Sequence, residues 1–250
     1  MQEQTIGGWS ADFMRELPEK PSAHREDAIL RAARDNRLAP ITWMEVTSKK
    51  NNRTVVLFVS ADALRLGDEH ASVRVTVSAR TTQRIADALG CVLPTTKICD
   101  LIWEQAAVKL APCIQSPDKA MGYTSRMIQH HDRVEKARAG RPGLIENVGK
   151  HWVLTNRLAS KRDASANYGW YDHRAPYLSG KHRVWQPLGL AHNLDHVDYS
   201  QVVRLVQQCC LVDGEERDLK EVLVDRELSP LVSNEGPLKF TRLPGVKLDA

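Results

Sequence analysis

The order of the secondary-structure signals constrains the fold of this chain more than any single motif. Extended runs rich in β-branched residues occupy 41–47, 54–60 and 71–78, and a second group occupies 144–148, 151–158, 166–171 and 184–191. Segments with helical spacing of apolar residues lie between the two groups. Because strands and helices are segregated, the pattern predicts an α+β fold with antiparallel strands in the N- and C-terminal parts and a central helical cluster.

Residues with side-chain oxygens predict where the helices begin. A helix through about Arg37, one over 79–89 and a short one over 219–225 are each preceded by a capping residue, respectively Ser22, Ser78 and Asp218. Another helix is expected to begin at Pro94, Thr95 and Thr96. Gly90 follows the second of these helices, as expected of a helix end. A further helix is expected over 124–139, ending at Gly140. Within it, His131 lies on the apolar stripe and should be buried, whereas His130 should face solvent.

Two features of the strand pattern make specific predictions. The first three runs should pair as an antiparallel meander, and in the third the valines alternate with Arg74 and Thr76, so that one face should be wet. Around Asp198 the pattern is ambiguous. Asp198 and Gln201 have the spacing of a capping box, but the apolar run over 202–206 is equally typical of a strand.

Length and composition are those of a globular protein. With 250 residues, 42% apolar and 26% charged, the chain is expected to form a single domain over 1–250. Its parts would be an N-terminal helix and meander (1–78), central helices (79–140), a strand-rich site region (141–212) and a C-terminal segment wrapping the surface (213–250). The net charge of +4 comes from 35 basic and 31 acidic residues that are interspersed, so no nucleic-acid partner is expected.

The sequence says less about the compartment. No apolar run approaches the roughly 18 residues of a membrane span, and the first residues lack the basic start and apolar core of a signal peptide. A cytoplasmic location and release by another route both stay open, as does the oligomeric state. The five cysteines lack metal-type spacing and are expected to be reduced and mostly buried; they are Cys91, Cys99, Cys113, Cys209 and Cys210.

Chemistry-bearing side chains concentrate between His151 and Val206, which hold five of the nine His and three of the six Trp. His192 and Asp198 lie close together in a loop after an apolar strand, a common address for a polar site. His192 is the candidate general base and Asp198 its orienting acid. The further candidates that would stabilise charge or supply a hydroxyl are Tyr199, Ser200 and Arg204.

Two other uses of the same region stay open. His192, His196 and Asp198 could ligate a transition metal, although a further ligand is not evident, and no cofactor is otherwise expected. Polar and aromatic side chains on the neighbouring strands could line a groove for a sugar or peptide chain; these are Asn156, Tyr168, Trp170 and Trp185. The plainer interpretation of the aromatics is a strand core with loop anchors.

Several segments resemble a family of bacterial and phage proteins that lacks an established function. The segments are LGCVLPT (89–95), WVLTNRLA (152–159), NYGW (167–170), QPLGLAH (186–192) and VDYSQVVRLV (197–206). Many members of that family are exported, and the resemblance therefore implies action outside the cell or on a cell envelope. It assigns importance to His192, Asp198, Tyr199, Ser200 and Arg204, with Asn156, Tyr168 and Trp170. Where the family pattern has histidines, this chain has Val148, Tyr171 and Gln201.

The stretch from His192 to Arg204 is also faintly similar to the signature of L,D-transpeptidases. Val203 stands where that signature has its nucleophilic cysteine, so the activity itself is not expected. Cell-wall peptide remains a candidate ligand class. The sequence thus favours a hydrolase of an amide or glycan polymer such as bacterial cell wall. The alternative is a non-catalytic binding or structural module, phage- or envelope-associated, which explains the missing histidines more simply.

Overall fold

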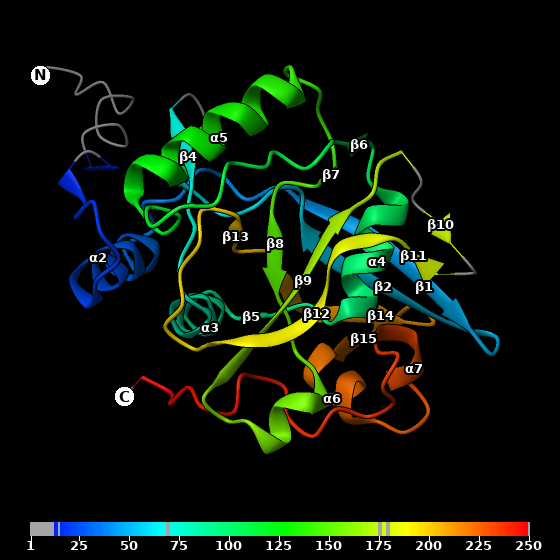
Figure 1. Cartoon of the computed structure of the whole chain (residues 1–250). Coiled ribbons are helices and arrows are strands. Elements are labelled where there is room, and N and C mark those ends of the chain that lie inside the picture. The colour runs from blue at the N-terminus through cyan, green and yellow to red at the C-terminus, as the bar shows by residue number, and fades with distance from the viewer. Residues whose placement is uncertain (1–12, 15, 69–70, 175–176, 179–180, 250) are drawn as a thin grey trace, which may run out of the picture.

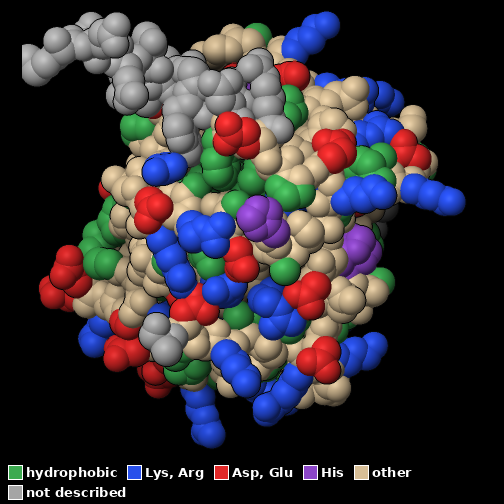
Figure 2. Space-filling view, turned by 90° about the vertical axis from the view of Figure 1, so that its left-hand side faces the viewer, with side chains coloured by type: hydrophobic (Ala, Val, Ile, Leu, Met, Phe, Trp, Pro, Cys, Tyr) green, Lys and Arg blue, Asp and Glu red, His purple; other side chains and the backbone are tan. Residues whose placement is uncertain are grey.

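The computed structural model describes residues 13–14, 16–68, 71–174, 177–178 and 181–249, which form an α+β fold. This confirms the predicted fold class. The helices in chain order are α2 (Ala23–Arg34), α3 (Ala79–Ala88), α4 (Thr96–Gln105), α5 (Thr124–Arg138), α6 (Leu219–Val224) and α7 (Ser229–Val232), with a 3₁₀ helix, η1 (Asn156–Ser160). None of the helices in these ranges combines the length and the apolar character that crossing a membrane requires. On the face of the molecule drawn in Figure 2, basic and acidic side chains are interspersed.

Two larger sheets organise the molecule (Figure 1). The first has the order β1-β2-β14-β15, with β5 also paired to β14; its strands are β1 (Trp43–Lys50), β2 (Arg53–Ser60), β14 (Val206–Val212), β15 (Glu215–Asp218) and β5 (Cys91–Val92). The second has the order β12-β9-β8-β13, formed by β12 (Val184–Asn193), β9 (Ala164–Tyr171), β8 (Lys150–Trp152) and β13 (Gln201–Val202). Strand β13 runs parallel to β8, and the other pairs are antiparallel.

Three short ribbons complete the described strands. Antiparallel pairs join β3 (Arg65–Gly67) to β4 (Ser72–Arg74) and β10 (Tyr177–Leu178) to β11 (Lys181–His182). A parallel pair joins β6 (Val108–Lys109) to β7 (Ile145–Glu146). Helix α5 packs on β4, and α4 packs against both β1 and β9, so α4 links the two larger sheets (Figure 1).

The expected caps form as predicted. Ser22, Ser78 and Asp218 each accept a hydrogen bond from a backbone N–H in the first turn of the helix that follows. Thr95, which was expected to lie in the first turn of its helix, is instead the N-cap of α4. The hairpin between β1 and β2 turns at Asn51 and Asn52, whose φ angles of 50° and 60° suit the type I′ turn of two-residue hairpins. Helix α2 ends at Arg34, earlier than expected, because the chain turns at Asn36, which has a φ of 56°.

The predicted three-stranded meander is wrong in its third strand. Strand β2 pairs with β14, from the far end of the chain, whereas β4 pairs with β3. The wet face predicted around Arg74 is wrong as well. The Arg74 side chain is buried because Asp62 and Glu135 neutralise its guanidinium at 2.6 and 2.7 Å.

Three other local predictions need correction. The strand expected over 151–158 ends at Trp152, because the Thr155 side chain caps η1 instead. Around Asp198 the strand alternative is the right one, since the chain enters β13 and not a helix. His130 is buried like His131; its Nε2 lies 2.9 Å from the Val148 carbonyl oxygen.

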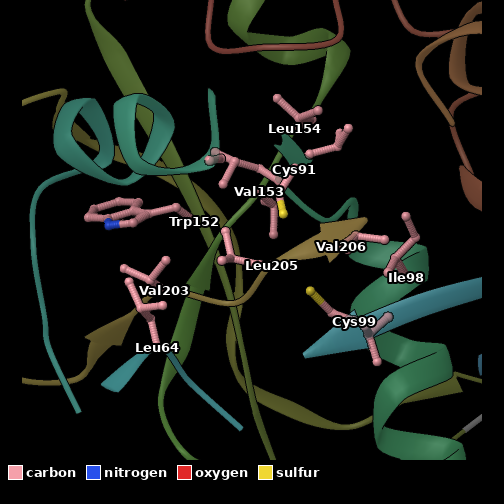
Figure 3. Packing of buried hydrophobic residues seen from close by; sticks show 14 of the residues in the cluster. Leu64, Cys91, Ile98, Cys99, Trp152, Val153, Leu154, Val203, Leu205 and Val206 are labelled. Atoms are coloured by element: carbon pink, nitrogen blue, oxygen red, sulfur yellow. The ribbon is translucent and has the colours of Figure 1, made fainter. Parts of the chain in front are cut away.

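The main core fills the space between the sheets and α4 (Figure 3). Val206 packs there with Ile98 and Cys99 of α4, whereas the Trp152 ring of β8 lies on the other side of Leu205, near Leu64 and Val203 (Figure 3). The Trp152 indole N–H donates to the Val77 carbonyl at 2.9 Å, so its polar atom is satisfied inside the core. This packing fixes β8 rigidly, and β8 carries the site described next.

All five cysteines lie in the described part of the chain, and each is a free thiol, as expected. Cys91, Cys99 and Cys210 are buried, Cys113 is half-buried and Cys209 is exposed. Burial raises the pKa of Cys91 to about 11, which keeps its thiol protonated at pH 7.

Candidate functional site

One face of the second sheet carries a row of polar side chains. Lys150 of β8 is the register partner of Gln201 on β13, and Trp152, two residues further along β8, is the partner of Asn167 on β9. His192 of β12 pairs with Ser165, two residues from Asn167. Because cross-strand partners and alternate residues share a face, Lys150, Asn167, His192 and Gln201 lie on the same side, which we call the polar face.

Lys150 is the centre of this face. Its Nζ lies 3.6 Å from Asp198 Oδ2 and 5.1 Å from the ring centroid of Trp170, and the residue is only 8% exposed. The other Asp198 oxygen accepts hydrogen bonds from the Ser200 N–H and hydroxyl, at 2.9 and 2.8 Å. The Lys150 ammonium group therefore lies between the Asp198 carboxylate and the face of the Trp170 ring, and both attract its positive charge.

His192 and His196 form a stacked pair beside Lys150. Their ring centroids are 3.7 Å apart and the rings are nearly parallel, at 8°. Burial, with a smaller contribution from the Lys150 cation, lowers the pKa of His192. Burial and then His192 lower the pKa of His196, while Asp198 opposes the shift in both. Both imidazoles are consequently neutral at pH 7 and able to accept a proton.

Several polar atoms on and next to the polar face are buried without a hydrogen-bond partner among the described residues. They are Asn167 Nδ2, Trp170 Nε1, His196 Nε2 and both amide atoms of Gln201. An unpaired buried donor costs about 1–3 kcal/mol, and buried polar groups in folded proteins are nearly always paired. The N–H groups of Asn167, Trp170 and Gln201, together with the Lys150 ammonium group, suit a ligand rich in oxygen acceptors.

The backbone is strained at the same place. Trp170 has a φ of 55°, a left-handed conformation that a bulky residue adopts rarely, and it follows Gly169 with a φ of 128°. Residues held in such conformations cost roughly 1–3 kcal/mol and cluster at functional sites. The strain brings the Trp170 ring against Lys150, where a regular strand would alternate it to the other side of β9.

The hydroxyl groups predicted to act in the site are engaged elsewhere. The Tyr199 hydroxyl accepts a hydrogen bond from the Gln115 N–H at 2.7 Å, and its ring meets the edge of His130. Ser200 is fully buried, with its hydroxyl donated to Asp198. Tyr199 therefore anchors the backbone of Gln115, and Ser200 orients Asp198; neither presents a free hydroxyl to solvent.

Arg204 lies in a separate buried cluster. Its guanidinium donates to the carbonyls of Ser60 and Ile145 and to the Glu146 carboxylate, at 2.7 to 2.8 Å. The other Glu146 oxygen lies 2.9 Å from His151 Nε2. Glu146, His151 and Arg204 are all buried, so Arg204 joins β2 and β7 to the start of β14 and does not reach a ligand from solvent.

The residues predicted to bind substrate do not form one groove. Only Trp170 lies at the polar face. The Tyr168 hydroxyl donates to Asp100 on α4 at 2.8 Å, and the Asn156 side chain holds the backbone of residues 237 and 239. Trp185 on β12 is 43% exposed.

The three positions at which this chain differs from the family it resembles also lie in different parts of the structure. Val148 is buried in a small core cluster under α5, and Tyr171 stacks on Trp103 with a centroid distance of 4.9 Å. Gln201 alone lies on the polar face. As for metal, no group of three or more His, Cys, Asp or Glu within the described ranges has an arrangement that could hold an ion, so the site suggested for His192, His196 and Asp198 does not form.

Sequence reasoning missed Lys150 and Asn167. Both stand in strands that read as apolar or mixed, and Lys150 was hidden in the short run VGKHW. The signal that could have found them is a polar residue in the middle of a strand with buried neighbours on both sides, which is costly unless it is paired or used.

Comparison with known proteins gives no assignment. No protein-family model, no curated protein and no solved structure matches this chain. Its function is therefore argued from the site.

Proposed function

We propose that this protein is a hydrolase that cleaves an amide polymer at the polar face, with bacterial cell-wall peptide as the substrate class. One observation carries the proposal: a neutral, half-buried His192 stacked on His196, with Lys150 and Asp198 acting on it electrostatically. The cell-wall substrate rests on the sequence resemblance to exported bacterial and phage proteins.

The roles follow from charge and position. His192 would take a proton from the attacking water and later give it to the leaving nitrogen, while the Asp198 carboxylate stabilises the imidazolium in between. Lys150, which is held by Asp198 and Trp170, would stabilise the negative charge that develops on the amide oxygen. Lys150 thus takes the part that the sequence suggested for Tyr199 or Arg204.

The same residues favour an amide over a glycosidic bond. Most glycoside hydrolases use a pair of carboxyl groups on opposite sides of the scissile bond. Among the described residues, Asp198 is the carboxylate whose charge acts on both His192 and His196. The unpaired Asn167 Nδ2, Trp170 Nε1 and Gln201 Nε2 would donate hydrogen bonds to the carbonyl oxygens of a peptide.

A non-catalytic binding module is the second candidate. It is favoured by the buried hydroxyl of Ser200 and by the two hydrogen bonds that occupy Asp198 Oδ1, which leave His192 without a hydrogen-bonded carboxylate. Such a module would use the polar face to hold the peptide without cleaving it.

Turnover and binding measured together separate the two functions. Purified protein is incubated with muropeptides of defined composition, and mass spectrometry follows the new amino and carboxyl ends. We expect His192→Ala to lower turnover by about 100-fold or more and Lys150→Met similarly, with binding largely kept in His192→Ala. His24→Ala, on the exposed start of α2, is the matched control. Binding without cleavage in the wild type would favour the module, and cleavage unchanged by His192→Ala would refute the hydrolase mechanism.

A further inference from the structure

A cavity lies away from the polar face, where β2 ends and β3 begins. Its volume is about 320 Å³, and its wall includes Ile41, Ser60, Asp62, Arg65, Ser72 and Arg138. Small-molecule pockets in proteins start at about this size. The wall combines apolar groups with two arginines, which is the composition expected of a site for a small amphipathic ligand.

The arginines around this cavity lie at unequal distances from the two carboxylates that neutralise them. Arg74, which is not in the cavity wall, holds the best contacts: Asp62 at 2.6 Å and Glu135 at 2.7 Å. The two arginines of the wall share the same carboxylates at longer range. Arg65 lies 3.2 Å from Glu135 and 3.7 Å from Asp62, and Arg138 lies 3.6 Å from Asp62 and 3.9 Å from Glu135.

This cluster of five groups therefore has three guanidiniums, which are Arg65, Arg74 and Arg138, against two carboxylates. Arg65 shows the consequence most directly. Its Nε is buried without a hydrogen-bond partner among the described residues. Burial, together with the neighbouring cations of Arg74 and Arg138, lowers the pKa of Arg65. An anion placed in the cavity would relieve both the unpaired donor and the like-charge contacts.

We propose that this cavity is a binding site for a small organic anion, whose carboxylate or phosphate group lies between Arg65 and Arg138. Guanidinium groups bind these oxyanions through paired hydrogen bonds, which makes two converging arginines selective for them. Ile41 and the small apolar residues of the wall would contact a short apolar body. The site shares no residue with the polar face and does not depend on the function proposed above.

Calorimetric titration of the full chain with valerate and, separately, with inorganic phosphate tests the site. We expect at least one probe to bind, with a Kd that becomes about tenfold weaker or more in Arg138→Gln, since a hydrogen bond to a charged group is lost. Arg226→Gln, at an exposed arginine two residues after the end of α6, is the matched control and should bind like the wild type.

Backbone amide shifts place the probe independently of affinity. Binding should move the amide signals of Ala61 and Leu64, which line the cavity, and should leave those of β8 unchanged. Valerate bound and phosphate not bound would identify a carboxylate ligand with an apolar body; the reverse would identify a phosphate ligand. Absence of binding by both probes, or equal binding by Arg138→Gln and the wild type, would overturn the proposal.

Discussion

Replacing Arg204 with leucine should strongly lower the free energy of unfolding. The substitution changes no residue of the polar face. Arg204 is fully buried and joins segments far apart in the sequence through Ser60, Ile145 and Glu146. Leucine fills part of the same volume but provides no donor. The measured loss of stability therefore reports mainly the loss of the buried ion pair and hydrogen bonds, and less the loss of packing.

The magnitude follows from what the substitution leaves behind. Glu146 has no exposed surface and, among the described residues, would keep the His151 side chain alone as a hydrogen-bond partner, at 2.9 Å. Breaking a buried ion pair by removing one partner costs about 3–5 kcal/mol, because a buried charge remains uncompensated. Two carbonyl oxygens also lose charged donors, so we expect a loss at the upper end of this range.

Urea unfolding followed by tryptophan fluorescence measures this loss. Arg204→Leu should unfold at a much lower urea concentration than the wild type with a similar slope, and Arg226→Leu, on the surface, should change stability by less than about 0.5 kcal/mol. The double variant with Glu146→Leu should recover about 2 kcal/mol, since no charge is then left unpaired. A loss below about 1 kcal/mol for Arg204→Leu would refute the reasoning.

Three further predictions concern acid stability, the C-terminal segment and the thiols. Burial lowers the pKa of His130 and of His131 to about 4, so as the pH falls below about 6.5 the unfolded chain binds a proton at each histidine before the folded chain does. The free energy of unfolding, measured with urea, should therefore decrease by about 2 kcal/mol per histidine from pH 7 to pH 5. The same pH dependence in His130→Gln as in the wild type would contradict this. Asn156→Ala should cost about 1–2 kcal/mol and increase amide exchange at 237–239 without affecting muropeptide turnover, whereas a selective loss of turnover would restore a substrate role. A thiol reagent should modify the exposed Cys209 first in the native protein, and modification of the buried Cys99 at the same rate would contradict the structure.

Local chemistry was readable from the sequence. The caps at Ser22, Ser78 and Asp218 involve hydrogen bonds over two or three residues, so the residue type and its position suffice to predict them. The segregation of strands and helices gave the fold class for the same reason. Each of these signals depends on neighbours in the chain.

Pairings between distant segments were not readable. The edge of β2 accepts β14, about 150 residues later, and no local pattern distinguishes it from the nearer run over 71–78. Arg74 reads as an exposed strand residue, because its burial depends on Asp62 and Glu135 from other elements. A charge in a strand is predicted as exposed unless its partner is known.

The site followed the same rule. His192, His196 and Asp198 were found because they are close in sequence, and the structure brings them together with Lys150. Arg204 was grouped with them only because it is six residues from Asp198, yet its hydrogen bonds go to Glu146 and to two carbonyls. Closeness in the sequence was enough to predict the loop of His192, His196 and Asp198. Lys150 could be identified only from the register of the sheet.

The most direct measurement is the pH dependence of muropeptide cleavage in the wild type and in His192→Ala. A general base with a lowered pKa stays unprotonated in mild acid, so cleavage should persist at pH 6.5 and decline only at lower pH. That acidic decline should be absent from any residual activity of His192→Ala. An identical pH profile and rate in both proteins would contradict the assignment of the polar face as the catalytic site.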